Sequence, residues 1–177
     1  GFTVCVFAGV SLPGLLRHQR LFLEEVDFNQ VIPVRQSGNT RVFYTLRLVD
    51  RVVRQIDYLV DVQTADFGQV DAYFVRADMT LQKPAIMARL LGPQILLHDP
   101  GDEGTLRRAA AELGIHAVTA VAGGPYRFQQ DVIRPARNGL RNLFIHLEMQ
   151  KGKVESSGEL PYECRSANWI YTGQAGV

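Results

Sequence analysis

The stretch TLRRAAAELGIHAVTAVA, residues 105–122, decides the fold class. Its first half consists largely of good helix formers and ends at Gly114, a residue type that often closes a helix in the left-handed conformation. Its second half is a short apolar run with β-branched residues, which is typical of a strand. The stretch therefore predicts a helix over 105–113 that leads directly into a strand over 115–122.

The same alternation of helix and strand continues outward on both sides. Strands are predicted at residues 3–10, 58–62, 72–76, 94–97 and 168–172, and helices at 39–56, 80–91 and 130–150. Residues 11–38 contain two prolines and little periodicity, and they predict a long loop. This order implies an α/β fold, a sheet flanked by helices on both faces. Ligands of such sheets bind at the carboxyl ends of the strands, here after Val10 and around residues 61–64 and 121–124.

The composition is that of one globular domain. The chain has 177 residues, of which 46% are hydrophobic and 21% charged, and its net charge is +1. This balance gives no bulk electrostatic argument for binding to nucleic acid or to an anionic membrane. No apolar run approaches the roughly 20 residues of a membrane span.

The two cysteines and the beginning of the sequence bear on where the protein is found. Cys5, expected to be buried in the strand at 3–10, and Cys164 form no metal-type spacing, which favours a reducing intracellular environment. The sequence opens inside a predicted strand with neither a signal nor a transit peptide, and we interpret it as a fragment or a processed product.

Four segments occur in order along residues 1–152 and resemble one known family. They are DFNQVIPV (27–34), DVQT (61–64), AYFVRAD (72–78) and AVTAVAGG (117–124). The segments are similar to motifs of the succinylglutamate desuccinylase/aspartoacylase family of zinc amidohydrolases. There the first motif reads Asp-Leu-Asn-Arg-x-Phe-Pro-Gly, the second Asp-Leu-His-Thr and the last Thr-x-Glu-x-Gly. The resemblance implies a zinc carboxypeptidase-like α/β fold, with a mixed, mostly parallel sheet flanked by helices on both faces, that lacks its first strands.

The departures from the family pattern concern the catalytic chemistry. In the family, zinc is held by an early His-x-x-Glu loop, which this sequence does not contain, and by the histidine of Asp-Leu-His. That histidine corresponds to Gln63, a neutral amide and a poor zinc ligand. The glutamate that activates the zinc-bound water corresponds to Val121, which cannot accept a proton. The resemblance therefore predicts a degenerate site with no metal and no catalytic residue.

Positions that contact substrate in the family are partly retained. Arg20, Asn29 and Arg107 match substrate-binding residues, whereas the arginine after Asn29 is replaced by Gln30, which removes one cationic contact to a carboxylate. We expect Arg20, Asn29 and Arg107 to converge as relics near the strand ends that carry Gln63 and Val121.

Other candidate residues have plain structural explanations. The four histidines show no ligand spacing; they are His18, His98, His116 and His146. The acidic residues Asp99, Asp102 and Glu103 precede a helix, where the helix dipole favours them. The arginines at 134, 137 and 141 lie three or four residues apart, either as a solvated helix face or as a stripe that docks a partner.

Two functions remain open. The first is a catalytically inactive protein that serves as a structural or accessory subunit of a larger intracellular assembly, in an organelle such as the mitochondrion. Its expected domains are a desuccinylase/aspartoacylase-like domain at 1–152 and a polar linker with the start of a β segment at 153–177. For this function we expect no cofactor and a stable complex with other protein subunits, or an oligomer, and the sequence gives no specific indication of nucleic acid as a partner. The second is a zinc-dependent deacylase of N-acyl amino acids whose missing ligands lie outside this chain.

Overall fold

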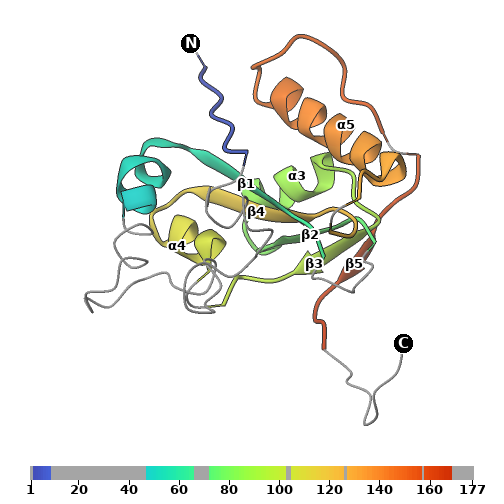
Figure 1. The fold of residues 1–177 in the computed structure, drawn as a ribbon, viewed down its shortest axis with the longest axis horizontal. Coiled ribbons are helices and arrows are strands. Elements are labelled where there is room, and N and C mark those ends of the chain that lie inside the picture. The colour runs from blue at the N-terminus through green and yellow to red at the C-terminus, as the bar shows by residue number, and fades with distance from the viewer. Residues whose placement is uncertain are drawn as a thin grey trace.

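A five-stranded mixed sheet forms the centre of the computed structural model (Figure 1). The structure describes residues 2–8, 47–65, 72–102, 105–125, 127–156 and 158–168. The strands are β1 (Tyr58–Gln63), β2 (Phe74–Ala77), β3 (Ile95–His98), β4 (His116–Val121) and β5 (Tyr162–Cys164). The helices are α3 (Gln82–Leu90), α4 (Leu106–Glu112) and α5 (Gln130–His146), with a 3-10 turn η2 (Val53–Gln55) after helical residues 47–51.

The strand order is β1-β4-β2-β3-β5, and one pairing reverses the chain direction. The pairs β1–β4, β2–β3 and β3–β5 are parallel, whereas β2 and β4 are antiparallel. The predicted mixed, mostly parallel α/β sheet is therefore confirmed. The reversal between β4 and β2 has a consequence for function, because the carboxyl ends of β1 and β4 lie at one edge of the sheet and those of β2 and β3 at the other.

Helices cover both faces of the sheet. On one face α3 contacts β2 and β4, and α5 packs on α3. On the other face α4 contacts β4 and β1, and a second apolar cluster joins α4 to Val49 and Val53 of the preceding helical segment. Within the described residues no helix is long and apolar enough to cross a membrane.

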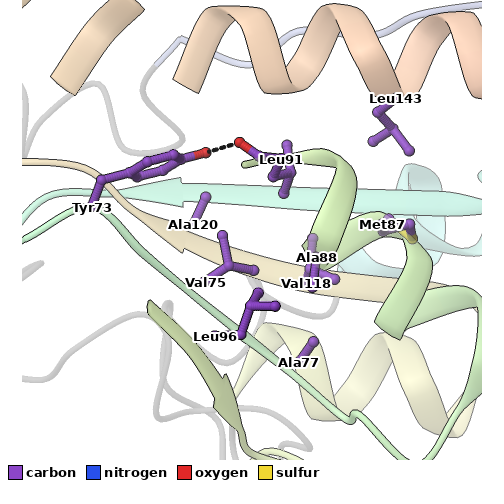
Figure 2. Close-up of a cluster of buried hydrophobic side chains, with 10 residues drawn as sticks. All are labelled: Tyr73, Val75, Ala77, Met87, Ala88, Leu91, Leu96, Val118, Ala120 and Leu143. Carbon is purple, nitrogen blue, oxygen red and sulfur yellow. Dashed lines mark hydrogen bonds between the residues drawn. The ribbon is translucent and has the colours of Figure 1, made fainter. Parts of the chain in front are cut away.

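The main core lies between the sheet and helices α3 and α5 (Figure 2). Leu96, Val75 and Val118 from three strands meet Met87 of α3, and all four are at most 1% exposed. Each such burial contributes about 1.5–3 kcal/mol before the loss of conformational entropy is subtracted. Tyr73 closes one end of the core, where its hydroxyl donates a hydrogen bond to the carbonyl oxygen of Leu91 at 3.0 Å. Burial raises the pKa of this hydroxyl, so it stays protonated as a donor.

The residues at both ends of α4 stabilise this helix, and Gly114 closes it as predicted. Thr105 caps α4, since its Oγ1 accepts a hydrogen bond from the backbone N–H of Arg108. Gly114 follows α4 with φ +79°, the left-handed conformation that a glycine adopts without strain. The predicted strands at 58–62, 72–76, 94–97 and 115–122 and the helices at 80–91, 105–113 and 130–150 are all present, with bounds shifted by a few residues. The helical residues 47–51 and η2 confirm the described part of the helix expected at 39–56.

Some local predictions are wrong. Residues 3–8 form no strand and no ladder, and Cys5 is exposed rather than buried, because no described strand lies beside this apolar segment. Helix α5 ends at His146, since Glu148 adopts a left-handed φ of +58°. The strand predicted at 168–172 is not present at Asn168, and its other residues lie outside the described part of the chain, as does the loop predicted at 11–38.

Residues after 152 add a strand that the sequence did not predict. β5 pairs with β3, and Arg89 of α3 holds Glu163 of β5 by an ion pair of 2.9 Å. The expected division of the chain at 152 stays a prediction, although the segment beyond it joins the same sheet.

Candidate functional site

The ends of β1 and β4 bring together the two positions that the sequence singled out. Gln63 and Val121 are direct partners in the parallel ladder, and Asp61 faces Thr119 in the same register. The pairing continues beyond the strands, since Ala65 donates its N–H to the carbonyl of Gly123 at 2.8 Å. Backbone hydrogen bonds thus fix this edge, and Gln63 lies beside Val121 as predicted.

The side chains at this edge lie on the face that α4 covers. Leu59 and Ala117 contact the α4 cluster, and the alternation of a strand places Asp61 and Gln63 on the same face as Leu59. Gln63 donates a hydrogen bond from Nε2 to Oδ2 of Asp61 at 2.5 Å. The amide of Gln63 is therefore engaged by the carboxylate two residues before it.

A polar row crosses three neighbouring strands next to this pair. Thr119 of β4 lies between Asp61 of β1 and Arg76 of β2 in register and is only 7% exposed. The Arg76 guanidinium lies over the ring of Phe74 at 5.4 Å, and its Nε is buried without a hydrogen-bond partner. Neither Thr119 nor Arg76 is among the predicted site residues; an isolated arginine in an apolar strand pattern was the available signal.

The described residues do not fit a zinc ion at this edge. No group of three histidine, cysteine, aspartate or glutamate side chains within the described ranges could hold a metal. An amide oxygen binds zinc weakly compared with imidazole, and the Gln63 amide already donates to Asp61. Val121 is 6% exposed and can neither ligate a metal nor move a proton. This edge, as far as it is described, offers one carboxylate and no general base at the position of the family's glutamate.

Arg107 lies at the opposite edge of the sheet. Its Nη2 forms an ion pair of 2.7 Å with Oδ2 of Asp99, directly after β3, and its Nη1 donates to the Asp99 carbonyl. Arg107 also lines a small pocket of about 130 Å³ with His116, the first residue of β4. At about 3.3 Å per residue, the length of β4 separates this edge from Val121 by about 16 Å. The predicted convergence of Arg107 with Gln63 is therefore wrong, because β2 and β3 run antiparallel to β4.

Charge at this second edge is balanced within the chain. Burial lowers the pKa of the Arg107 guanidinium, and Asp99 opposes that shift by its charge and hydrogen bond. Burial alone would raise the pKa of Asp78, but hydrogen bonds from the Thr80 hydroxyl and backbone N–H lower it below its ordinary value. These residues form a structural network at the carboxyl ends of β2 and β3.

The two histidines at this edge, His98 and His116, make contacts within the chain. His98 accepts a hydrogen bond at Nδ1 from the backbone N–H of Met79 at 3.1 Å, so its Nδ1 carries no proton. The 3.8 Å between Nδ1 and Asp78 is therefore not an ion pair in this tautomer. Burial, followed by the charge of Lys83, lowers the pKa of His116, which lies beside the Tyr58 ring at 5.4 Å. Neutral imidazoles in these contacts serve packing.

The remaining predicted site residues lie outside the described part of the chain. They are Arg20, the residues Asn29 and Gln30 of the first motif, and also His18 and Glu103. Their roles as substrate-binding relics, as a histidine candidate and as a helix-dipole charge stay predictions.

Comparisons with known proteins support the fold. No family model and no curated protein matches the sequence. Solved structures do match. Succinylglutamate desuccinylase/aspartoacylase from Rhodobacter sphaeroides has a TM-score of 0.71 at 19% identity over 86% of this chain and 48% of its own. The product-bound ectoine utilization protein EutE of Ruegeria pomeroyi has a TM-score of 0.75 at 18% identity, covering 88% and 49%. A succinylglutamate desuccinylase from Silicibacter sp. TM1040 has a TM-score of 0.72 at 21% identity, covering 85% and 47%.

These similarities confirm at the level of fold the resemblance found in the sequence. The described sheet is that of the succinylglutamate desuccinylase/aspartoacylase structures, whose names identify them as deacylases. The chain spans about half the length of these solved proteins.

Proposed function

We propose that the protein is a catalytically inactive member of this hydrolase fold that serves as a structural or accessory subunit of a protein assembly. The observation that carries the proposal is the pair Gln63 and Val121 at the adjoining ends of β1 and β4. A metal ligand and a general base stand side by side there in the family pattern. In this chain one is an amide engaged by Asp61 and the other is a buried aliphatic side chain. A hydrolase fold that has lost its catalytic residues can still serve as a scaffold that binds other proteins.

The assembly part of the proposal has its own support. Residues 2–8 expose four large apolar side chains, which are Phe2, Val4, Val6 and Phe7. Exposed apolar surface of this extent is typical of a surface that is covered by a partner. Both cysteines of the described residues are free thiols, in keeping with an intracellular, reducing setting.

The second candidate is a zinc-dependent deacylase whose remaining ligands lie outside this chain. Asp61 favours it, because this carboxylate is retained beside the position of the family's histidine and is a usable zinc ligand. This alternative requires Gln63 to release Asp61 and another group to replace the base at Val121.

Hydrolysis of N-succinylglutamate and N-acetylaspartate by the full chain, with zinc added, separates the two candidates. We expect no release of free amino acid above that of a chelator-treated control, since neither a general base nor an imidazole ligand stands at the strand ends. Zinc-dependent turnover that Asp61→Asn abolishes while the neighbouring Val62→Ala leaves it unchanged would favour the deacylase. Val62 is a suitable control because its side chain is 59% exposed on the other face of β1.

A further inference from the structure

The outward face of the first half of α5 carries cations that the described part of the chain leaves unpaired. Arg134 and Arg137 are exposed on successive turns, and Arg127 lies just before the helix. Residues three and four apart on a helix lie about 5–6 Å apart, so the side chains of Arg134 and Arg137 form one stripe, which Arg127 precedes in the sequence. Among the described residues none of these three arginines has an ion-pair or hydrogen-bond partner, although exposed arginines elsewhere, such as Arg54 and Arg89, are paired.

The second half of the same stripe shows which kind of side chain pairs with these arginines. Arg141, one turn beyond Arg137, forms an ion pair of 2.6 Å with Glu155, which lies on the segment that returns over α5 (Figure 1). Asn142 fixes the backbone of that segment with two hydrogen bonds, of 2.8 and 2.9 Å, to Glu155. A single carboxylate on the returning segment thus already pairs with an arginine in the last turns of the helix.

The unpaired part of the stripe also has an apolar component. Phe128 is 94% exposed and follows Arg127 directly, and Ile133 is 38% exposed beside Arg134 and Arg137. A large aromatic side chain that is almost fully exposed and next to an arginine in the sequence matches the composition of protein-interface centres, where aromatic residues and arginine are enriched. The occupant must therefore offer an apolar side chain as well as negative charge.

We propose that the surface formed by Arg127, Phe128, Ile133, Arg134 and Arg137 docks an acidic segment of a partner protein, in which carboxylates flank an apolar residue. The partner's carboxylates form ion pairs with Arg134 and Arg137, as Glu155 does with Arg141, and its apolar residue packs on Phe128. Arginine suits this role because its planar fork matches a carboxylate in two hydrogen bonds. A net charge of +1 gives no broad basic field of the kind that binds nucleic acid or anionic membranes, which favours a protein partner. The inference rests on the proposed function only in expecting that the chain works bound to a protein.

The test uses the full chain and a short synthetic peptide with the core Glu-Asp-Leu-Glu-Glu, with affinity measured by calorimetry. We expect the double variant Arg134→Glu/Arg137→Glu to weaken binding at least about tenfold. The control Arg51→Glu reverses an exposed arginine on a different helix, one that has no ion-pair partner among the described residues, and should change the affinity less than about twofold. Circular dichroism verifies that each variant is folded.

Phe128→Ser distinguishes a docking surface from a diffuse attraction between charges. It should weaken binding of the peptide with the central leucine and leave unchanged the binding of a matched peptide with serine there, because only the first peptide buries an apolar side chain. Equal affinities for wild type and the double variant would overturn the proposal, as would a Phe128→Ser variant that binds the leucine peptide as tightly as wild type. A single-stranded oligonucleotide or phosphatidylserine vesicles that bind more tightly than the peptide, through the same arginines, would also overturn it.

Failure of this test and failure of the proposed function are separate results. Loss of the peptide interaction leaves the absence of hydrolysis at Gln63 and Val121 unaffected. Zinc-dependent hydrolysis, in turn, would refute the inactive assignment without changing what Arg134 and Arg137 bind.

Discussion

Gly139→Ala is expected to lower the urea midpoint of unfolding by about 1–2 M. Gly139 lies in α5 where this helix crosses the end of α3, and a Cβ at this position would stand 2.0 Å from the carbonyl oxygen of Leu91 and 2.5 Å from its Cα. These are backbone atoms, so no side-chain rotation relieves the overlap, and the two helices must separate. Separation opens the core around Leu91 and Leu143, at a cost of about 3 kcal/mol or more.

The direction of this effect opposes helix propensity, which makes the experiment decisive. Alanine in place of glycine inside an exposed helix stabilises it by about 1 kcal/mol. Asn138→Ala, one position earlier and only half-buried, serves as the control and should change stability by less than about 1 kcal/mol. A Gly139→Ala midpoint at or above that of wild type would mean that α5 does not cross α3 this closely.

The second large effect is expected for Asp99→Asn. This substitution leaves the Arg107 guanidinium, whose side chain is 7% exposed, without its negative partner. It also weakens the hydrogen bond that Asp99 accepts from the backbone N–H of Gly101 at 2.7 Å. Removing one partner of a buried pair is costly, and we expect a loss of about 3 kcal/mol in the free energy of unfolding, measured by urea titration.

Two comparisons identify the buried charge as the cause. Arg107→Met should cost less than Asp99→Asn, because it removes the buried cation itself and leaves Asp99, 21% exposed, within 3.9 Å of Arg76. Asp50→Asn breaks the exposed pair with Arg54 and should cost less than about 1 kcal/mol. A larger loss for Arg107→Met than for Asp99→Asn would contradict this explanation.

Local pattern was sufficient for the elements that surround the core. The apolar runs of β1 and β4 and the cap residues Thr105 and Gly114 specify their structure within a few residues, so they could be predicted from the sequence. β5 could not, because Tyr162–Cys164 is short and half-polar and exists through pairing with β3. The apolar run at 3–8 has a composition typical of a strand, but a strand also needs a neighbouring strand with which its backbone can form hydrogen bonds.

The candidate site was predictable in the residues that end the individual strands, but not in how strands of opposite direction are arranged. The pairing of Gln63 with Val121 follows once both strands are parallel neighbours, and the sequence predicted both strands. The position of Arg107 depends on the antiparallel pairing of β2 with β4, a long-range relation that no local pattern encodes. The close approach at Gly139 likewise depends on two helices that are far apart in the sequence but in contact in the fold.

The metal content of the purified full chain tests the central claim most directly. After dialysis against zinc and then against buffer, mass spectrometry of the acid-digested protein should find zinc far below one equivalent, and Gln63→Ala should give the same value. The reason is that the Gln63 amide is a weak ligand already hydrogen-bonded to Asp61, and Val121 beside it offers no donor. One full equivalent of tightly bound zinc in the wild-type chain, lost in Gln63→Ala, would contradict the claim that the zinc site of this fold is missing at Gln63 and Val121.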